Sequence, residues 1–297
     1  MVPQAEALHQ KWPDNVARHV ELDSVPFFPQ LDHECGPAAL ATVMVYRGVA
    51  VTPQALVEKV YLPQRRGSLQ IEMLAAPRAS GLVSWQLEPK FEDVLREVEA
   101  GNPVIVLQDY GVWPVSYWHY AVVVGFDSDN GRVVLRSGEK QRLEIPLRVF
   151  EYTWKESGYW AMAVVPTDRI PATAKDDAWL AAIAAMERVA DPQAARRAYT
   201  TFANRWPEHL NGAIALANVD YGLGDLPQAE SVLRAATQRH PKSVVAFNNL
   251  AQVVSDRNRP AEALELIDEA IALGGPFMPQ AQETRTQILK KLQTARP

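Results

Sequence analysis

The single cysteine of the chain, Cys35, is the first candidate for chemistry. A lone cysteine forms no intramolecular disulfide, so it is either a small buried hydrophobe or a reactive thiol. Gly36 and Pro37 follow it and open a segment, 38–47, whose apolar residues recur at helical spacing. Proline is favoured in the first turn of a helix. The pattern therefore places Cys35 at a helix N-terminus, where the helix dipole and free amides would stabilise a thiolate.

A base and an oxyanion donor can be matched to this thiol. His119 begins an apolar run, 118–125, that has the length and β-branched composition of a buried strand. A histidine at the head of such a strand can face a helix N-terminus and accept a proton. Gln30, five residues before Cys35, can direct its side-chain amide to the same place. Each residue alone is more often structural, but the ordered combination favours a catalytic site.

Three segments together resemble a known family. They are Val-Pro-Phe-Phe-Pro-Gln at 25–30, Cys-Gly-Pro-Ala-Ala-Leu at 35–40 and His-Tyr-Ala-Val-Val-Val-Gly-Phe-Asp at 119–127. The sequence is similar here to the papain-like bacteriocin-processing (double-glycine leader) peptidases and their free-standing relatives. The resemblance covers about half of the chain, from Val25 to about Val165.

The resemblance implies specific roles and a substrate class. Cys35 would be the nucleophile, His119 the general base and Gln30 the oxyanion donor. The substrate would be a peptide or protein cut after small residues or after double glycine. No cofactor is implied.

The chain departs from the family where a carboxylate usually orients the histidine. Ser137, in Arg-Ser-Gly, stands in place of that aspartate. A hydroxyl can hold a ring nitrogen, but it stabilises an imidazolium less than a carboxylate does. Three interpretations remain open: Ser137 serves weakly as third member, Asp109 or Asp127 compensates, or activity is low.

Aromatic residues crowd the connection before His119. Tyr110, Trp113, Tyr117 and Trp118 lie within eleven residues of sequence, 108–118. Loops held on a rigid scaffold tend to line binding sites, so Trp113, Tyr117 and Trp118 are candidate substrate contacts. The alternative is that these rings cap the core.

The order of predicted elements gives an α+β fold class for the first half. Helices come first and an antiparallel sheet follows, with the nucleophile on the leading helix, in agreement with a papain-like cysteine peptidase domain. We expect an N-terminal arm at 1–23, the peptidase domain at 24–166, a linker at 167–174 and an all-α repeat domain at 175–297. Among local signals, Thr52 and Ser68 are each predicted to cap a helix.

The second half repeats every 34 residues. Pro207 and Pro241 keep this spacing, as do Ala195, Ala229 and Ala263. A 34-residue period with small residues on the second helix resembles the tetratricopeptide repeat (TPR). We expect three units, at 176–207, 210–241 and 244–275, and a capping helix at about 279–293.

Such a stack has two interpretations. Repeat solenoids present concave surfaces, so the groove could bind a peptide or a protein partner, with asparagines such as Asn218 and Asn249 holding its backbone. Alternatively the repeats only stabilise or dimerise the protein.

Composition excludes several other classes. The chain has 297 residues, a net charge of -5 and 47% hydrophobic residues, which is ordinary globular composition and gives no reason to expect nucleic acid. No apolar run approaches the roughly 18 to 20 residues of a membrane-spanning helix. The six histidines show no metal-ligand spacing, and one cysteine cannot build a structural zinc site.

Localisation is left open. The first residues, 1–6, have neither a basic region nor an apolar core, so no signal peptide is visible. Relatives of the resembled kind are commonly exported or lipid-anchored. A bacterial protein is therefore expected, periplasmic or lipid-anchored if an export segment has been removed, and otherwise cytoplasmic.

The leading hypothesis is a stand-alone cysteine peptidase whose repeat domain recruits a substrate or partner. A second hypothesis is a non-enzymatic binding module in which the peptidase fold has lost activity. A third keeps the thiol but transfers an acyl group instead of hydrolysing it, because residue spacing cannot separate hydrolysis from transfer.

Overall fold

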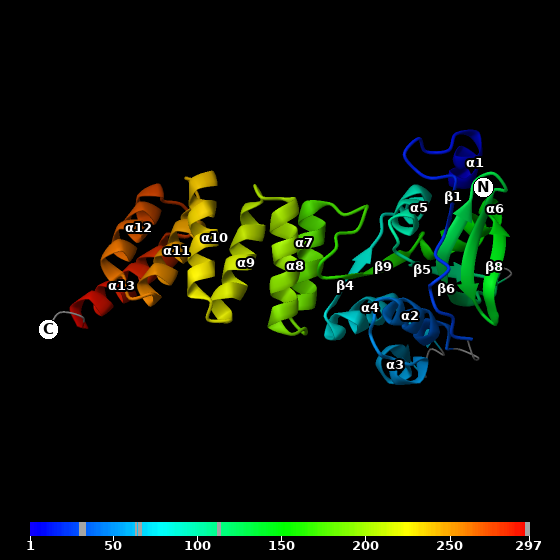
Figure 1. Cartoon of the computed structure of the whole chain (residues 1–297), viewed down its shortest axis with the longest axis horizontal. Coiled ribbons are helices and arrows are strands. Elements are labelled where there is room, and N and C mark those ends of the chain that lie inside the picture. The colour runs from blue at the N-terminus through cyan, green and yellow to red at the C-terminus, as the bar shows by residue number, and fades with distance from the viewer. Residues whose placement is uncertain (30–33, 63, 65–66, 112–113, 295–297) are drawn as a thin grey trace. The chain divides into compact units, whose positions relative to one another are not determined.

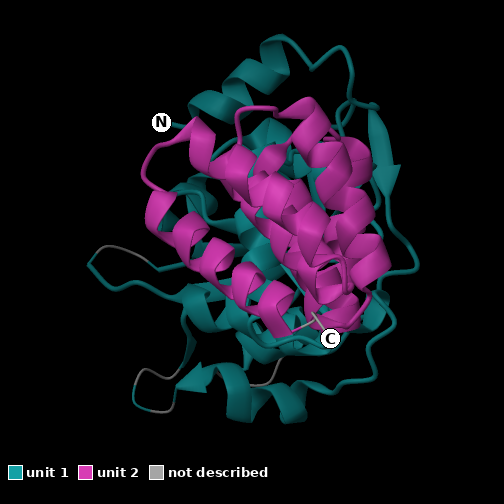
Figure 2. Cartoon of the chain, turned by 90° about the vertical axis from the view of Figure 1, so that its left-hand side faces the viewer, with its two compact units in different colours: residues 1–191 teal, residues 192–297 magenta. Residues whose placement is uncertain are grey.

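The structure, a computed structural model, describes residues 1–29, 34–62, 64, 67–111 and 114–294 (Figure 1). The chain divides into two compact units, unit 1 at Met1–Asp191 and unit 2 at Pro192–Pro297 (Figure 2). Unit 1 mixes helices and strands, and the described part of unit 2 is helical. The predicted order, an α+β domain followed by an all-α domain, is confirmed.

Unit 1 is built from the following elements in chain order: α1 (Pro3–Gln10), β1 (His19–Glu21), α2 (Cys35–Tyr46), α3 (Pro53–Val60), β2 (Tyr61–Leu62), β3 (Gly67–Ser68), α4 (Gln70–Ala75), the 3-10 helix η2 (Ala76–Ser80), β4 (Leu82–Gln86), α5 (Phe91–Glu99), β5 (Val104–Asp109), β6 (Trp118–Asp127), β7 (Arg132–Ser137), β8 (Lys140–Pro146), α6 (Leu147–Trp154), the 3-10 helix η3 (Lys155–Ser157), β9 (Ala161–Pro166) and α7 (Asp176–Glu187).

An antiparallel sheet forms the centre of unit 1. Its strand order is β4-β9-β5-β6-β7-β8. β1 also pairs with β6, at residues 125–127, which follow the register shift between β6 and β7. β1 approaches Gly125 so closely that a Cβ there would lie 2.6 Å from the Val20 carbonyl oxygen. The sequence at this position therefore has to be glycine for the extra strand to join β6.

The predicted N-terminal arm, 1–23, thus contributes two elements to unit 1. Besides β1, it forms α1, whose first turn binds a buried carboxylate. The amides of Gln4 and Ala5 donate to Glu151 of α6 at 3.1 and 2.6 Å. The positive end of a helix dipole favours a carboxylate at this place. The arm is therefore held by a polar contact as well as by strand pairing.

One face of the sheet packs against α2. Leu40, Val43 and Met44 of α2 are fully buried in one cluster with the β6 side chains of Tyr120, Val122 and Val124. α2 is apolar on nearly all sides, and its surface away from the sheet is covered by Leu56 and Val60 of α3. This double burial fixes the axis of the helix that carries Cys35.

The other face is covered by α5 and α6. Their aromatic side chains pack on each other, with Phe91 and Phe150 ring centroids 5.0 Å apart and Phe150 and Trp154 5.3 Å apart. Alternation along the strands directs Val106 of β5 and Ala121 of β6 to this side. The sheet is consequently buried on both faces.

Two predicted helix caps have different outcomes. Thr52 caps α3 as expected, its hydroxyl accepting from the Ala55 amide at 3.2 Å. The Ser68 prediction is wrong, because Ser68 pairs with Tyr61 in the β2–β3 ladder and α4 begins two residues later. Ser68 instead packs against Gly36, where a Cβ would lie 2.4 Å from its hydroxyl oxygen.

Residues 167–174, predicted as a linker, are bonded to unit 1. Thr173 donates through its amide and hydroxyl to the buried Glu97 carboxylate at 2.7 and 2.6 Å. Its hydroxyl also accepts from the Trp85 indole at 2.8 Å. Trp85 in turn meets Trp179 of α7 edge-on at 5.8 Å. The compact unit accordingly extends through α7 to Asp191.

The described helices of unit 2 follow the sequence period closely. They are α8 (Pro192–Arg205), α9 (Leu210–Gly222), α10 (Leu226–Arg239), α11 (Val244–Asp256), α12 (Pro260–Leu273) and α13 (Met278–Thr294). α8, α10 and α12 begin 34 residues apart, and so do α9, α11 and α13. α7 begins 34 residues before α9, which extends the period into unit 1.

The small residues that repeat are buried where helices pack. Ala195, Ala229 and Ala263 are fully buried, as are Ala236 and Ala270. A small side chain at such positions lets helix axes approach closely, so these residues explain the spacing seen in the sequence. The core around α11 and α12 is otherwise mainly aliphatic, and α8 adds the buried rings of Tyr199 and Phe202.

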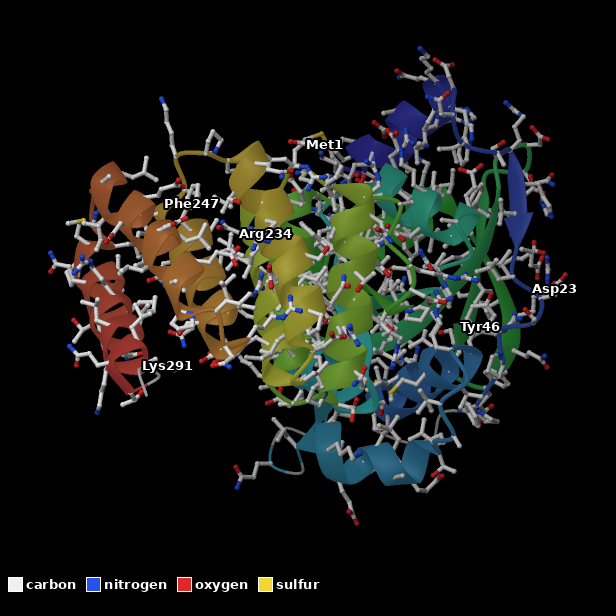
Figure 3. All side chains as sticks on the ribbon, turned by 60° about the vertical axis from the view of Figure 1, so that its left-hand side comes forward. Met1, Asp23, Tyr46, Arg234, Phe247 and Lys291 are labelled. Carbon is white, nitrogen blue, oxygen red and sulfur yellow. The ribbon has the colours of Figure 1, made fainter. Side chains whose placement is uncertain are left out.

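A cluster of ion pairs joins the helices of unit 2. Glu230, 7% exposed, accepts from Arg234, Arg257 and Arg259. Arg234 also pairs with Glu262 and Lys291 with Asp256, and Figure 3 labels both of these basic residues. A buried carboxylate needs such partners, because removing it from water is costly without them.

We predict that Leu40→Ala, in α2, lowers the free energy of unfolding by about 2 to 5 kcal/mol, because it leaves a cavity beside β6. Ile71→Ala is the matched control, since Ile71 is 69% exposed and its loss should change stability by less than about 0.5 kcal/mol. Urea unfolding of the full chain is followed by tryptophan fluorescence. Seven of the eight tryptophans lie in 1–191, so this signal reports mainly on unit 1. Equal losses in both variants would contradict the packing described for α2.

Candidate active site

Cys35 is the first residue of α2 and is half-buried. Burial raises the pKa of its thiol above the ordinary value, although backbone N–H groups of Tyr120, Gly36 and Cys35 itself point to the sulfur and act to lower it. The expected stabilisation of a thiolate by the helix N-terminus is thus outweighed. In the free protein Cys35 is a neutral thiol at pH 7.

His119 is the second residue of β6 and is 8% exposed. Its Nε2 lies 2.9 Å from the Ser137 hydroxyl oxygen. Tyr110 stacks on the imidazole, with ring centroids 5.2 Å apart and an angle of 29° between the planes. Burial lowers the pKa of His119 to about 4, so the imidazole is neutral at pH 7.

Strand register explains why Ser137 meets His119. β6 pairs Val122 with Arg136 of β7, which sets Ser137 opposite Ala121 and diagonal to His119 on the same face. On its other side His119 pairs directly with Gln108 of β5. The neighbours of the imidazole are therefore set by the pairing of three consecutive strands.

The thiol and the imidazole reach the same end of β6 by different routes. Cys35 packs with the core on the α2 face, and its sulfur meets the backbone of Tyr120, the residue after His119. The His119 side chain belongs to the opposite face, which it shares with Gln108. Ser137 occupies Nε2, so Nδ1 is the nitrogen left for an interaction at the strand end.

The remaining predicted site residues have varied positions. Gln30 and Trp113 lie outside the described residues. Tyr117 and Trp118 are 57% and 47% exposed, close in sequence to His119. Tyr110, by contrast, contacts the imidazole directly.

Neither aspartate considered as a substitute for Ser137 is directed to His119. Asp109 accepts from the amides of Gly111 and Tyr117 at 2.8 and 2.7 Å and so holds the loop before β6. Asp127 closes the turn after β6 by accepting from the Asn130 side chain and amide. It lies eight residues from His119, about 26 Å along an extended strand. Among these candidates, only Ser137 contacts the imidazole.

Two further residues near His119, Gln108 and Thr153, are not apparent from motif spacing. Gln108, fully buried, donates from Nε2 to the Thr153 hydroxyl of α6 at 2.7 Å, and its Oε1 accepts from the Tyr110 hydroxyl at 2.9 Å. In the sequence, Gln108 could have been noticed only as a polar residue that continues the predicted buried strand 104–107. No sequence signal links it to Thr153, which lies 45 residues away.

The described residues contain no group of three histidine, cysteine, aspartate or glutamate side chains arranged to hold a metal ion. No helix within these residues has the length and apolar character needed to cross a membrane.

Comparison with solved structures finds partial matches. A C39-like peptidase from Bacillus anthracis is 20% identical, covers 50% of this chain and 98% of its own, and has a TM-score of 0.43. A double glycine motif protease from an AMS/PCAT transporter, in complex with the leader peptide, is 23% identical, with coverage of 51% and 96% and a TM-score of 0.40. The TPR2B domain of yeast Sti1 is 24% identical, with coverage of 34% and 85% and a TM-score of 0.33.

The comparison with curated proteins finds no match. The comparison with family models does: residues 22–162 match the Peptidase_C39 like family, a segment that includes Cys35, His119 and Ser137. This match supports a cysteine peptidase type of function for unit 1. The papain-like α+β fold predicted for this part of the chain is confirmed, and residues 22–162, just under half of the chain, are similar to the C39-like peptidase family.

Proposed function

We propose that the protein is a cysteine peptidase that hydrolyses peptide bonds with Cys35 as nucleophile and His119 as general base. One observation carries the proposal beyond the family match. The Cys35 sulfur lies at a helix N-terminus beside the backbone amide of Tyr120, the residue that follows His119. A thiol, a base and backbone donors gathered at one strand end are the groups that acyl chemistry requires.

The reaction follows from these groups. The thiol proton moves to His119 Nδ1 as the sulfur bonds to the carbonyl carbon, and the oxyanion accepts from the Cys35 amide. Gln30 is the proposed second donor. The carbon–nitrogen bond then breaks, His119 gives the proton to the departing amine, and a thioester remains on Cys35. Water, deprotonated by His119, hydrolyses the thioester and restores the thiol.

The electrostatics indicate a low resting reactivity. A thiol with a raised pKa and an imidazole with a pKa of about 4 form a neutral pair, not a thiolate–imidazolium pair. Ser137 contributes a hydroxyl and no charge to stabilise imidazolium. Proton transfer from Cys35 to His119 is therefore coupled to substrate binding. It occurs when the developing oxyanion of the bound substrate accepts hydrogen bonds from its donors in the site.

The substrate and the role of unit 2 form the finer part of the proposal. By family resemblance, cleavage follows small residues or double glycine. Unit 2 recruits the substrate protein or a partner, which its stacked helices would hold in a concave groove. Asn249 of α11 donates to Asn218 of α9 at 3.3 Å, so amide groups of two successive repeats are adjacent.

A second candidate function is a peptide-binding module without catalysis. The neutral Cys35–His119 pair and the hydroxyl at Ser137 favour it, because both weaken a nucleophile. The two candidate functions differ in one respect: a peptidase cleaves peptides through the sulfur of Cys35, and a binding module cleaves none.

We predict that Cys35→Ser abolishes cleavage of peptides that contain Gly-Gly, Gly-Ala or Ala-Ala. The loss should be at least about a thousandfold, because the nucleophile is replaced by a far weaker one of nearly equal size. Cleavage is measured by mass spectrometry, and circular dichroism checks that the variant stays folded. Thr42→Ser, a buried substitution about two turns further along α2, is the matched control and should retain cleavage. An unchanged rate in Cys35→Ser would reject this function.

We predict that Ser137→Asp accelerates alkylation of Cys35 by iodoacetamide at pH 6 to 7 by about tenfold or more. In the wild type burial raises the pKa of the Cys35 thiol, so the thiolate forms only in the alkaline range and the rate should climb there. A carboxylate beside Nε2 favours imidazolium, raises the His119 pKa by about 1 to 3 units and thereby stabilises the thiolate.

Ser137→Asn provides the control for this experiment, since it matches aspartate in size without the charge. Its profile should remain that of the wild type. A wild-type inflection near pH 6, or equal acceleration by aspartate and asparagine, would contradict the electrostatic account of the site.

A further inference from the structure

The ring of Tyr110 covers the imidazole of His119. The two rings are stacked, with centroids 5.2 Å apart and an angle of 29° between their planes. Tyr110 is 39% exposed and His119 is buried, so the tyrosine ring separates the imidazole from water on this side. Stacking covers a face of the imidazole and leaves its edge, where the ring nitrogens make their bonds, to other groups such as Ser137.

Tyr110 is held in this position through its side chain and its backbone. Its hydroxyl donates to Gln108 Oε1 at 2.9 Å, and the fully buried Gln108 donates in turn to the Thr153 hydroxyl at 2.7 Å. The Tyr110 amide donates to the Tyr117 carbonyl oxygen at 2.9 Å, across the neck of the loop before β6. Asp109 closes the same neck by accepting from two loop amides. These bonds keep the phenol ring over the imidazole.

The charged side chains on the elements around His119 have partners of their own. They are Asp109 of β5, Glu97 of α5, Arg136 of β7 and Glu151 of α6. Asp109 and Glu151 accept from backbone amides, and Glu97 accepts from Thr173. Arg136 donates to two backbone carbonyl oxygens. Burial raises the pKa of the two titratable neighbours, Cys35 and Tyr110, so both are uncharged at pH 7. The exclusion of water is therefore the main influence on the charge of the imidazole.

A stacked aromatic ring acts on an imidazolium in two opposite ways. The negative face of the ring attracts a cation, which favours protonation about two- to fivefold. The exclusion of water disfavours the cation, and at a buried histidine this effect can exceed about a hundredfold. Because His119 is buried, the second effect is the larger one, in agreement with a pKa lowered to about 4. The Tyr110 ring thus favours the neutral imidazole.

We propose that Tyr110 is a positioning residue whose ring, held by Gln108 and by the loop neck, shields His119 from water and keeps the imidazole in its neutral, proton-accepting form under acidic conditions. The proposal deepens the cysteine peptidase function proposed above and rests on it for its purpose. A shielded base can take the Cys35 proton at about pH 5, where an ordinary histidine with a pKa of about 6.5 is charged. The protein would therefore cleave its substrate in mildly acidic surroundings.

The test is nuclear magnetic resonance of the full chain labelled with ¹⁵N-histidine, at about pH 5.5. His119 is assigned as the imidazole whose signals disappear in His119→Gln, and circular dichroism checks that each variant is folded. In the wild type, a pKa of about 4 predicts that about 3% of the His119 rings are protonated. Tyr110→Ala admits water to the imidazole and should raise the protonated share about tenfold.

Two further variants separate the ring from other effects. Tyr110→Phe keeps the ring and loses only the bond to Gln108, so its protonated share should lie closer to the wild type than to Tyr110→Ala. Tyr152→Ala is the matched control, because it removes a tyrosine ring that is 60% exposed on α6 and should leave the share unchanged. Where peptides are cleaved, the acidic limb of the kcat/KM profile should move to higher pH in Tyr110→Ala, since that profile reports the base of the free enzyme.

An unchanged or lower protonated share in Tyr110→Ala would overturn the proposal, as would a share in Tyr110→Phe equal to that in Tyr110→Ala. Its failure can be told from that of the peptidase function, because the protonated share is measured without turnover. Without any cleavage, a share that rises in Tyr110→Ala and stays low in Tyr110→Phe still supports the shielding role. With cleavage, an imidazole that does not respond to Tyr110→Ala overturns it.

Discussion

The antiparallel pairing of β5, β6 and β7 is the constraint on which the site depends. Pairing of Gln108 with His119 and of Val122 with Arg136 determines which side chains can touch the imidazole. A shift of one residue would exchange the two faces of β6 and send His119 into the α2 core. The buried apolar residues of β6 resist such a shift, so hydrophobic packing sets the chemistry of the strand end.

Burial supports this geometry and works against the reactivity of the groups it holds. The α2 helix brings Cys35 to the strand end because its apolar sides are covered on both flanks. The same covering raises the pKa of the thiol and lowers that of His119. A helix N-terminus and three backbone amides do not offset the loss of solvent. The Ser137 hydroxyl that meets the imidazole carries no charge that could offset this loss.

Much of the fold could be predicted from sequence because its signals are local. Thr52 caps its helix through a residue three positions away, and the 34-residue period depends on small residues at helix contacts. Ser68 failed as a cap because it pairs with Tyr61 of β2, seven residues earlier, in a ladder that its cap-like sequence does not reveal. Ser137 could be identified from the family pattern, but Gln108 and Thr153 could not, because they meet only after α6 folds onto the sheet.

The most direct measurement is acylation of Cys35 by an activated ester of an N-blocked glycylglycine, followed by intact mass and peptide mapping. The account predicts one acyl group on Cys35, formed about a hundredfold more slowly in His119→Ala, the magnitude typical of general-base assistance. It also predicts slow hydrolytic release of that acyl group. No acylation of Cys35, or an equal rate in His119→Ala, would contradict the claim that this pair performs acyl chemistry.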